Sequence, residues 1–271
     1  MVRAKTTVSL DSRPVKMSDK YPILDFDSDR PAVAEPSKLI ARNEAMPEHC
    51  VLCFFQSAID ALLARKQITL ITNLRSEMGH HPVYLLNDSE PPVALFQPGI
   101  GAPLAAALFE ELIALGGTKF IACGTAGVLD SFISAGRLLI PVEAVRDEGT
   151  SYHYVPPGEE VHPSANALRA IEATLTSAKA SFQKVKTWTT DGIYRETSGK
   201  IEKRKSSGCS CVDMEASALF AVAEFRGVEF GQVLLAADDA GGESWDARGC
   251  FGMGGEKEKA LQMAIEACKL I

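Results

Sequence analysis

The sequence predicts a single α/β domain of three layers, in which helices cover both faces of a mostly parallel sheet. Short apolar segments rich in β-branched residues alternate along the chain with segments of helical length. Continuous apolar strands that alternate with helices are typical of parallel sheets buried on both faces. With 271 residues, 46% of them apolar, the chain can form one large core, and no linker of biased composition divides it.

The order of the segments supports this architecture. The predicted strands are 68–72, 83–86, 93–96, 120–123, 138–142, 185–189 and 233–237. The predicted helices are 102–115, 164–178, 214–226 and 257–270, and the apolar run 50–64 is predicted to be a further buried helix. The stretch 1–37 is polar and is broken by prolines. We therefore predict an N-terminal extension at 1–33, its first twenty residues loosely ordered, and the domain at 34–271.

Charge and cysteine content exclude several classes of protein. The net charge is -7, and the basic cluster at 200–205 also contains Glu202, which indicates a solvated helix face and no nucleic-acid partner. The first twenty residues lack an apolar core of signal-peptide length, and no apolar run is long enough for a membrane span. The seven cysteines are scattered, and Cys50 and Cys53 lack a matching second pair for zinc. These features predict a cytoplasmic protein without a metal site.

Two glycine-containing junctions follow predicted strands. Gly99 and Gly101 lie between the strand 93–96 and a helix that Pro103 opens. Ligands of α/β sheets bind where strands end and helices begin, and a helix N-terminus favours anions. Thr125 and Gly127 follow the strand 120–123 in the same way. Each junction is also compatible with an ordinary turn.

Glu215 and the pair Asp238-Asp239 are the candidate carboxylates. In the predicted helix 214–226, Glu215 shares a face with apolar residues, where a carboxylate needs partners. Those partners are either the two hydroxyls of a sugar diol or an internal salt bridge or cap. Asp238 and Asp239 end the strand 233–237. One of them is suited to cap a turn, and the other to act as a general acid at the edge of the sheet.

These segments together resemble the nucleoside phosphorylase family, which includes uridine phosphorylases, hexameric purine nucleoside phosphorylases and methylthioadenosine/adenosylhomocysteine nucleosidases. The resemblance covers roughly residues 34–242 and rests on "PGIGAPLAAALFEEL", "IACGTAGVLDSFISAGRLLIP", "RDEGTSYHY", "TTDGIYRE" and "VDMEASALFAVAEFRGV". It implies a mixed, twisted central sheet that is partly curled into a barrel. It also implies a pentosyltransferase that cleaves the N-glycosidic bond of a purine nucleoside or uridine with phosphate.

The resemblance also implies roles for individual residues. Glu215 would hold the ribose hydroxyls beside Met214 and Asp213, and Asp238 would protonate or hydrogen-bond the leaving base at N7. Further substrate-binding residues would be Gly101, Thr125, Gly127, His153, Thr190, Asp191 and Tyr194, and phosphate would meet Gly99, Gly101, Thr125 and Lys38. Nucleoside and inorganic phosphate would be the only small-molecule partners, without a further cofactor, and the chain would form a homodimer or a hexamer built as a trimer of dimers.

The chain departs from the family at the phosphate site. Lys38, in "AEPSK", and Ala122, in "IACGTAG", occupy positions where family phosphorylases carry arginines. Arg42, Arg75, Arg137 or Arg146 could substitute. The nucleosidases also lack the second arginine, so a phosphate-independent nucleosidase and a non-catalytic nucleoside-binding protein are the alternatives. The choice between purines and uridine also stays open.

Overall fold

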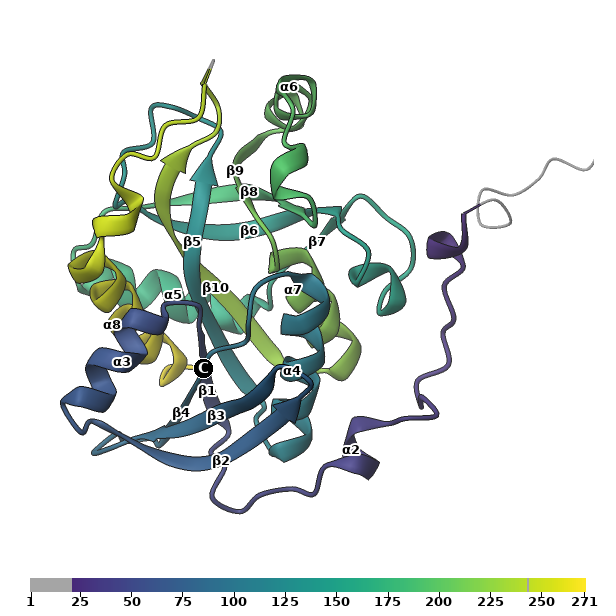
Figure 1. Ribbon diagram of the computed structural model, residues 1–271, viewed down its shortest axis with the longest axis vertical. Coiled ribbons are helices and arrows are strands. Elements are labelled where there is room, and N and C mark those ends of the chain that lie inside the picture. The colour runs from purple at the N-terminus through teal and green to yellow at the C-terminus, as the bar shows by residue number, and fades with distance from the viewer. Residues whose placement is uncertain (1–20, 243) are drawn as a thin grey trace, which may run out of the picture.

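A single sheet of ten strands organises the computed structural model, which describes residues 21–242 and 244–271 (Figure 1). The strands are β1 (His49–Cys53), β2 (Ile68–Ser76), β3 (Gly79–Leu86), β4 (Val93–Phe96), β5 (Lys119–Val128), β6 (Leu138–Asp147), β7 (Glu160–Val161), β8 (Phe182–Thr190), β9 (Cys209–Asp213) and β10 (Glu229–Asp239). Their order is β10-β6-β8-β9-β5-β1-β4-β3-β2, with β7 paired to β6. Because β10 also pairs with β5, five strands close into a barrel-like ring, and the other strands extend from β5.

Helices cover both faces of this sheet. They are α2 (Pro36–Leu39), α3 (Gln56–Ala64), α4 (Ala102–Leu115), α5 (Ala165–Ser177), α6 (Ser198–Ser206), α7 (Ala216–Arg226) and α8 (Gly254–Cys268), with 3₁₀ turns η1 (Pro22–Leu24), η2 (Ser151–His153), η3 (Ile193–Arg195) and η4 (Cys250–Gly252). Figure 1 shows α3, α5 and α8 on one side of β5 and α4 and α7 on the other. Two apolar clusters fill the two helix–sheet interfaces. The predicted three-layer α/β fold with a mixed, partly barrel-like sheet is confirmed.

The segment 50–64 corrects one prediction. It is the strand β1 followed by the helix α3, with a break at Phe54 and Phe55. All five residues of β1 are buried, between β4 and β5 in a parallel register. A strand that is apolar on both faces cannot be told from a buried helix by periodicity. The same ambiguity concealed β9, whose short sequence "CSCVD" also carries polar residues.

Six strands are longer than predicted, namely β2, β3, β5, β6, β8 and β10, and the extensions of β5 and β10 affect the candidate site. β5 continues through the glycine-containing stretch 124–127, and β10 continues through Asp238 and Asp239. The ladder between them pairs Ala236 with Ala126 and then shifts register before Asp239 pairs with Val128. The residues predicted to form loops after these strands therefore lie within the barrel wall.

β9 reaches β5 from the opposite direction. It pairs antiparallel with the end of β5, so that Val212 lies opposite Gly127. The chain then turns into α7, which packs against α4. This path brings the start of α7 to the start of α4, although 114 residues separate Gly101 from Glu215.

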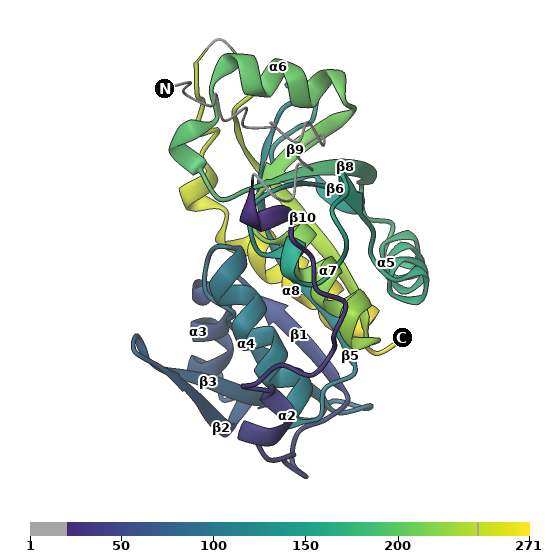
Figure 2. The same cartoon turned by 90° about the vertical axis from the view of Figure 1, so that its right-hand side faces the viewer.

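The segment before β1 lies along the helices α4 and α7 (Figure 2). The Arg30 guanidinium donates to the carbonyl oxygen of Phe225, and Glu35 forms an ion pair with Arg226 at the end of α7. The predicted boundary at residues 33 and 34 falls within this segment. The prediction for the first twenty residues lies outside the described part of the chain. Among the helices of the described residues, none has the length and apolar character to cross a membrane.

Candidate active site

The loop between β4 and α4 meets the segment before α7. Gly99 and Gly101 have φ angles of 79° and 94°, in the region that favours glycine, and a Cβ on Gly99 would lie 2.3 Å from Leu104. The Gly101 N–H donates to Glu215 Oε1 at 2.6 Å, and the Gly99 N–H donates to Gln97 Oε1 at 2.8 Å. Two sites predicted separately from the sequence, the glycine loop and Glu215, are therefore in contact.

Glu215 precedes α7 instead of lying on a face of that helix, which corrects its predicted setting. It occupies the N-cap position, with φ at -138°, and is 8% exposed. Burial, and next the neighbouring charge of Asp213, raise the pKa of Glu215 to about 8. No ion pair of the described residues involves Glu215. Of the two readings of this carboxylate, the salt bridge therefore lacks structural support.

Asp213 holds Glu215 in place. One of its oxygens, Oδ2, accepts the N–H groups of Glu215 and Ala216 at 2.8 and 2.6 Å and so caps α7. The other, Oδ1, accepts the hydroxyls of Thr187 and Thr189, each at 2.9 Å. Since protein donors occupy both oxygens, Asp213 is placed to position Glu215. Burial raises the pKa of Asp213 in spite of these bonds.

Asp238 and Asp239 have separate environments. The buried Asp239 forms an ion pair with Arg248 and accepts the Gly241 N–H at 2.8 Å. Asp238 is half-buried and lies beside Gly127, where an added Cβ would be 3.4 Å from Asp238 Oδ2. Asp239 is thus held by Arg248 and by the turn at Gly241, whereas Asp238 lies beside Gly127 of β5. Of the two, Asp238 is the one available to a ligand.

Glu196 is a candidate that the sequence reasoning missed. It follows η3 in the quoted segment "TTDGIYRE" and is half-buried. Burial, and next the charge of Asp238, raise the pKa of Glu196 to about 7. Because only folding brings Glu196 near Asp238, its place in the "TTDGIYRE" motif was the one signal in the sequence.

The remaining predicted base-pocket residues divide between buried and exposed positions. Thr190 is 2% exposed, and its hydroxyl accepts the Gly192 N–H. Asp191 is exposed and accepts the Gly149 N–H at 2.9 Å, while Tyr194 is 93% exposed. Met214 is half-buried next to Glu215, and Thr125 is exposed on β5. Thr125 and Tyr194 are therefore accessible to a ligand, whereas Thr190 supports the turn after β8.

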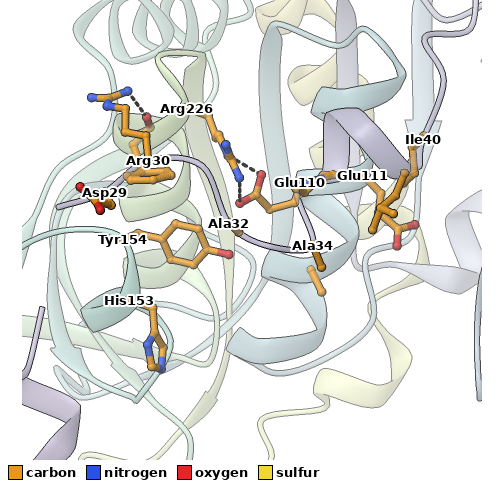
Figure 3. A pocket seen from close by; sticks show the side chains of 14 residues that line it. Asp29, Arg30, Ala32, Ala34, Ile40, Glu110, Glu111, His153, Tyr154 and Arg226 are labelled. Carbon is orange, nitrogen blue, oxygen red and sulfur yellow. Dashed lines mark hydrogen bonds and ion pairs between the residues drawn. The ribbon is translucent and has the colours of Figure 1, made fainter. Parts of the chain in front are cut away.

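His153 and Asp191 line a cavity of about 460 Å³ beside the first turns of α4, together with Pro103, Ala106, Ala107, Ile23, Gly149, Thr150 and Tyr154. His153 also borders a second cavity of about 480 Å³ (Figure 3). This second cavity lies toward the far end of α4, where Arg226 pairs with Glu110. The glycine loop, Glu215 and Asp238 line neither of them. His153 thus borders both of these cavities, neither of which the carboxylates of Glu215 and Asp238 line.

Lys38 is not brought to the site. It lies in α2, which packs on α4, and Glu35 just before α2 pairs with Arg226. Arg226 is the last residue of α7 and also pairs with Glu110, nine residues beyond Gly101 on α4. Nine helical residues span roughly 13 Å. Lys38 therefore lies at the opposite ends of α4 and α7 from the glycine loop and Glu215, which contradicts its predicted contact with phosphate in the same chain.

Of the four candidate substitute arginines, Arg42 is distant from the glycine loop and Arg146 is occupied. Arg42 lies against Gly116 at the far end of α4. Arg146 is buried and donates to the Ser151 hydroxyl and to two backbone carbonyls. Among the hydrogen bonds and ion pairs of residues 21–242 and 244–271, none joins Arg75 or Arg137 to the glycine loop, Thr125 or Glu215.

Comparison with known proteins identifies the family. The sequence model of the phosphorylase superfamily matches residues 48–269 of the chain. The chain belongs to the phosphorylase superfamily. The predicted resemblance to nucleoside phosphorylases is thereby confirmed.

The similar proteins are named for different substrates. The chain is 30% identical over 210 residues to a uridine phosphorylase of Treponema pallidum (strain Nichols), covering 72% of this chain and 80% of that protein. It is 27% identical over 154 residues to a guanosine phosphorylase of Halorubrum lacusprofundi, covering 55% of this chain and 64% of that protein. An AMP nucleosidase structure from Bacteroides thetaiotaomicron shares the fold at 22% identity, with a TM-score of 0.67, over 82% of this chain and 87% of that chain.

The buried carboxyl of Glu215 predicts a pH-dependent stability. Its pKa in the folded state, about 8, exceeds the ordinary value of 4.5. Its contribution to stability is thus complete below about pH 4.5 and is lost as the pH rises to about 8. Glu215→Gln cannot ionise, so we expect this variant to be more stable than the parent at pH 8.5, by on the order of 4 kcal/mol, and nearly equal at pH 5. Thermal unfolding across this range tests it, and a difference that does not vary with pH would contradict the raised pKa.

Proposed function

We propose that the chain is a nucleoside phosphorylase, a pentosyltransferase that cleaves a purine nucleoside or uridine with phosphate to give the free base and ribose 1-phosphate. The observation that carries the proposal is the hydrogen bond from the Gly101 N–H to Glu215. This bond joins two features in a chain of the phosphorylase superfamily. One is a glycine loop, which lets a ligand come close to the backbone, and the other is a buried carboxylate without an ion-pair partner among the described residues. The uridine and guanosine phosphorylases among the relatives support the same reaction class.

The proposed chemistry assigns each carboxyl a separate task. Ionised Glu215 accepts hydrogen bonds from the 2′- and 3′-hydroxyls, which fixes the ribose beside Met214. The bond between C1′ and the base nitrogen breaks, and its electron pair moves to the base. For a purine, Asp238 donates a proton to N7 as this charge develops. A phosphate oxygen, approaching along Thr125 and the glycine loop, forms the new bond to C1′.

Hydrolysis by water is the second candidate. The observation that favours it is that neither of the two family arginine positions supplies a cation at the glycine loop, since Lys38 lies at the far ends of α4 and α7 and position 122 is Ala. Charged contacts to phosphate contribute about 1.5–3 kcal/mol each, so phosphate binding without them is weak. The AMP nucleosidase fold neighbour is compatible with this alternative.

Product analysis with and without phosphate decides between these reactions. Purified protein is incubated with inosine, guanosine, adenosine or uridine in phosphate buffer and in phosphate-free buffer. We expect free base and ribose 1-phosphate to form only when phosphate is present. Free ribose in phosphate-free buffer would establish the nucleosidase instead, and tight nucleoside binding without either product would indicate a binding protein.

The assembly is a further part of the proposal. We expect a homodimer or a hexamer, because the family resemblance implies this, and the protein works without a metal or organic cofactor. Light scattering after gel filtration measures the mass of the particle, for which a monomer of 29.1 kDa is the reference. We expect the activity to survive dialysis against EDTA, which removes metal ions.

A further inference from the structure

Trp245 is a large aromatic side chain held near the candidate acid. Its side chain is 60% exposed, whereas the other tryptophan, Trp188, is completely buried. The next residue, Asp246, exchanges two backbone hydrogen bonds with Asp239, at 2.8 and 3.0 Å. Arg248 then donates to the backbone carbonyl of Ile133 and pairs with Asp239. Trp245 therefore stands at the start of an anchored segment instead of on an untethered loop.

The indole of Trp245 donates a hydrogen bond to Asp238 Oδ2 at 2.7 Å. An indole N–H can only donate, so Oδ2 must act as the acceptor in this pair. Because the carbonyl oxygen of a carboxylic acid accepts more strongly than its hydroxyl oxygen, the indole favours the Asp238 proton on Oδ1. A hydroxyl or a water at the place of the indole could either donate to Oδ2 or accept from it. The Asp238 proton would then be distributed over both oxygens.

The surroundings of Asp238 make this restriction useful. Glu196 lies close enough for its charge to interact with Asp238, so the carboxyl experiences a repulsive neighbour. Gly127 on β5 lies close to Asp238 Oδ2, since a Cβ added to Gly127 would be 3.4 Å from this oxygen and 3.2 Å from Val212. The Trp245 donor occupies one oxygen of Asp238, which leaves the other oxygen for a ligand.

We propose that Trp245 is a positioning residue that orients Asp238, so that the proton leaves from Oδ1 toward the purine base. This inference rests on the proposed function, because it concerns the step in which the glycosidic electron pair moves to the base. In that step the Asp238 Oδ1–H bond breaks, a bond from N7 to that proton forms, and Asp238 is left ionised. The indole hydrogen bond to Oδ2 then stabilises the carboxylate that results.

The test compares variants in the full-length protein with inosine as the substrate. Trp245→Phe keeps an aromatic ring and removes the donor, and we expect kcat to fall about tenfold, the effect of one hydrogen bond to a charged group. Phe251→Leu is the matched control, because Phe251 is an aromatic residue of the same segment, 85% exposed, and should leave kcat unchanged. Since Trp245 acts through Asp238, Trp245→Phe should cause no further loss in an Asp238→Asn background.

An indole N–H resonance provides a readout that does not depend on turnover. In protein labelled with ¹⁵N-tryptophan, the two side chains give two indole signals, and Trp245→Phe identifies the one that belongs to Trp245. We expect this signal to shift in Asp238→Asn and to stay in place in Phe251→Leu.

The inference is overturned by an unshifted indole signal, or by equal fold-losses from Trp245→Phe in the parent and in Asp238→Asn. If Asp238→Asn reduces turnover while Trp245→Phe does not, the role of Trp245 fails and the proposed function stands. If Asp238→Asn itself leaves the turnover of inosine unchanged, the acid role and the inference fail together.

Discussion

Replacing Glu215 with alanine is expected to lower kcat/KM for nucleosides by about two to four orders of magnitude. The variant loses two hydrogen bonds from sugar hydroxyls to a buried carboxylate, each contributing about 1.5–3 kcal/mol. Glu215 is 8% exposed and in contact with the glycine loop, so water cannot readily replace the missing oxygens. Steady-state kinetics with ribosides measures the effect.

Two comparisons make this expectation specific to the sugar. A 2′,3′-dideoxynucleoside lacks the diol, so the parent and Glu215→Ala should turn it over at similar, low rates. Glu111→Gln is the matched control. This glutamate lies in α4, on the same side of the sheet as α7, but it lines the cavity at the far end of α4. Full activity of Glu215→Ala on ribosides would remove the basis of the nucleoside proposal.

Binding of a riboside should also release a proton at neutral pH. The raised pKa of Glu215, about 8, means that the free protein holds this carboxyl largely protonated at pH 7. Hydroxyl donors favour the ionised form, so the proton leaves as the diol binds. Calorimetric titration in two buffers that differ in ionisation enthalpy would detect this release, and Glu215→Gln should abolish it.

The adjacent aspartates give the second large effect. Asp238→Asn is expected to lower kcat for purine nucleosides by about two to four orders of magnitude, because general acid catalysis typically contributes this much. The loss with uridine should be smaller, since uracil has no N7 to protonate. Kinetics on inosine and uridine with the same preparation provide the comparison.

Asp239→Asn is the matched partner of this variant. It leaves Arg248 partly buried without its ion-pair partner, so we expect a stability loss of about 3 kcal/mol and a smaller change in kcat. Thermal unfolding measures the first quantity and the same nucleoside assay the second. A large loss of kcat in Asp239→Asn with an unaffected Asp238→Asn would reverse the two roles.

Most helices and strands could be predicted because their patterns are local. The helix over Ala102–Leu115 and the strand over Val93–Phe96 have the predicted bounds, since glycines and a proline mark their ends. Predictions were less accurate where several strands meet. β5 and β10 continue beyond their apolar cores because each pairs with the other along the barrel wall, and this pairing depends on residues about a hundred positions apart.

The candidate site shows the same division. The sequence singled out Gly101, Glu215 and the two aspartates by residue type and by their resemblance to a family. It assigned Glu215 to a helix face, whereas the cap formed by Asp213 places Glu215 before the helix. It also missed Glu196 and Trp245, because neither residue has a distinctive local pattern.

The sequence by itself determined the α/β class, the family and the residue types that nucleoside chemistry requires, because periodicity and motifs are properties of neighbouring residues. Only the tertiary structure decided that Asp238 accepts the Trp245 indole while Asp239 anchors Arg248, and that Lys38 lies far from the glycine loop. The physical reason is that charge pairing, burial and distance between remote segments are established by the packing of the whole chain.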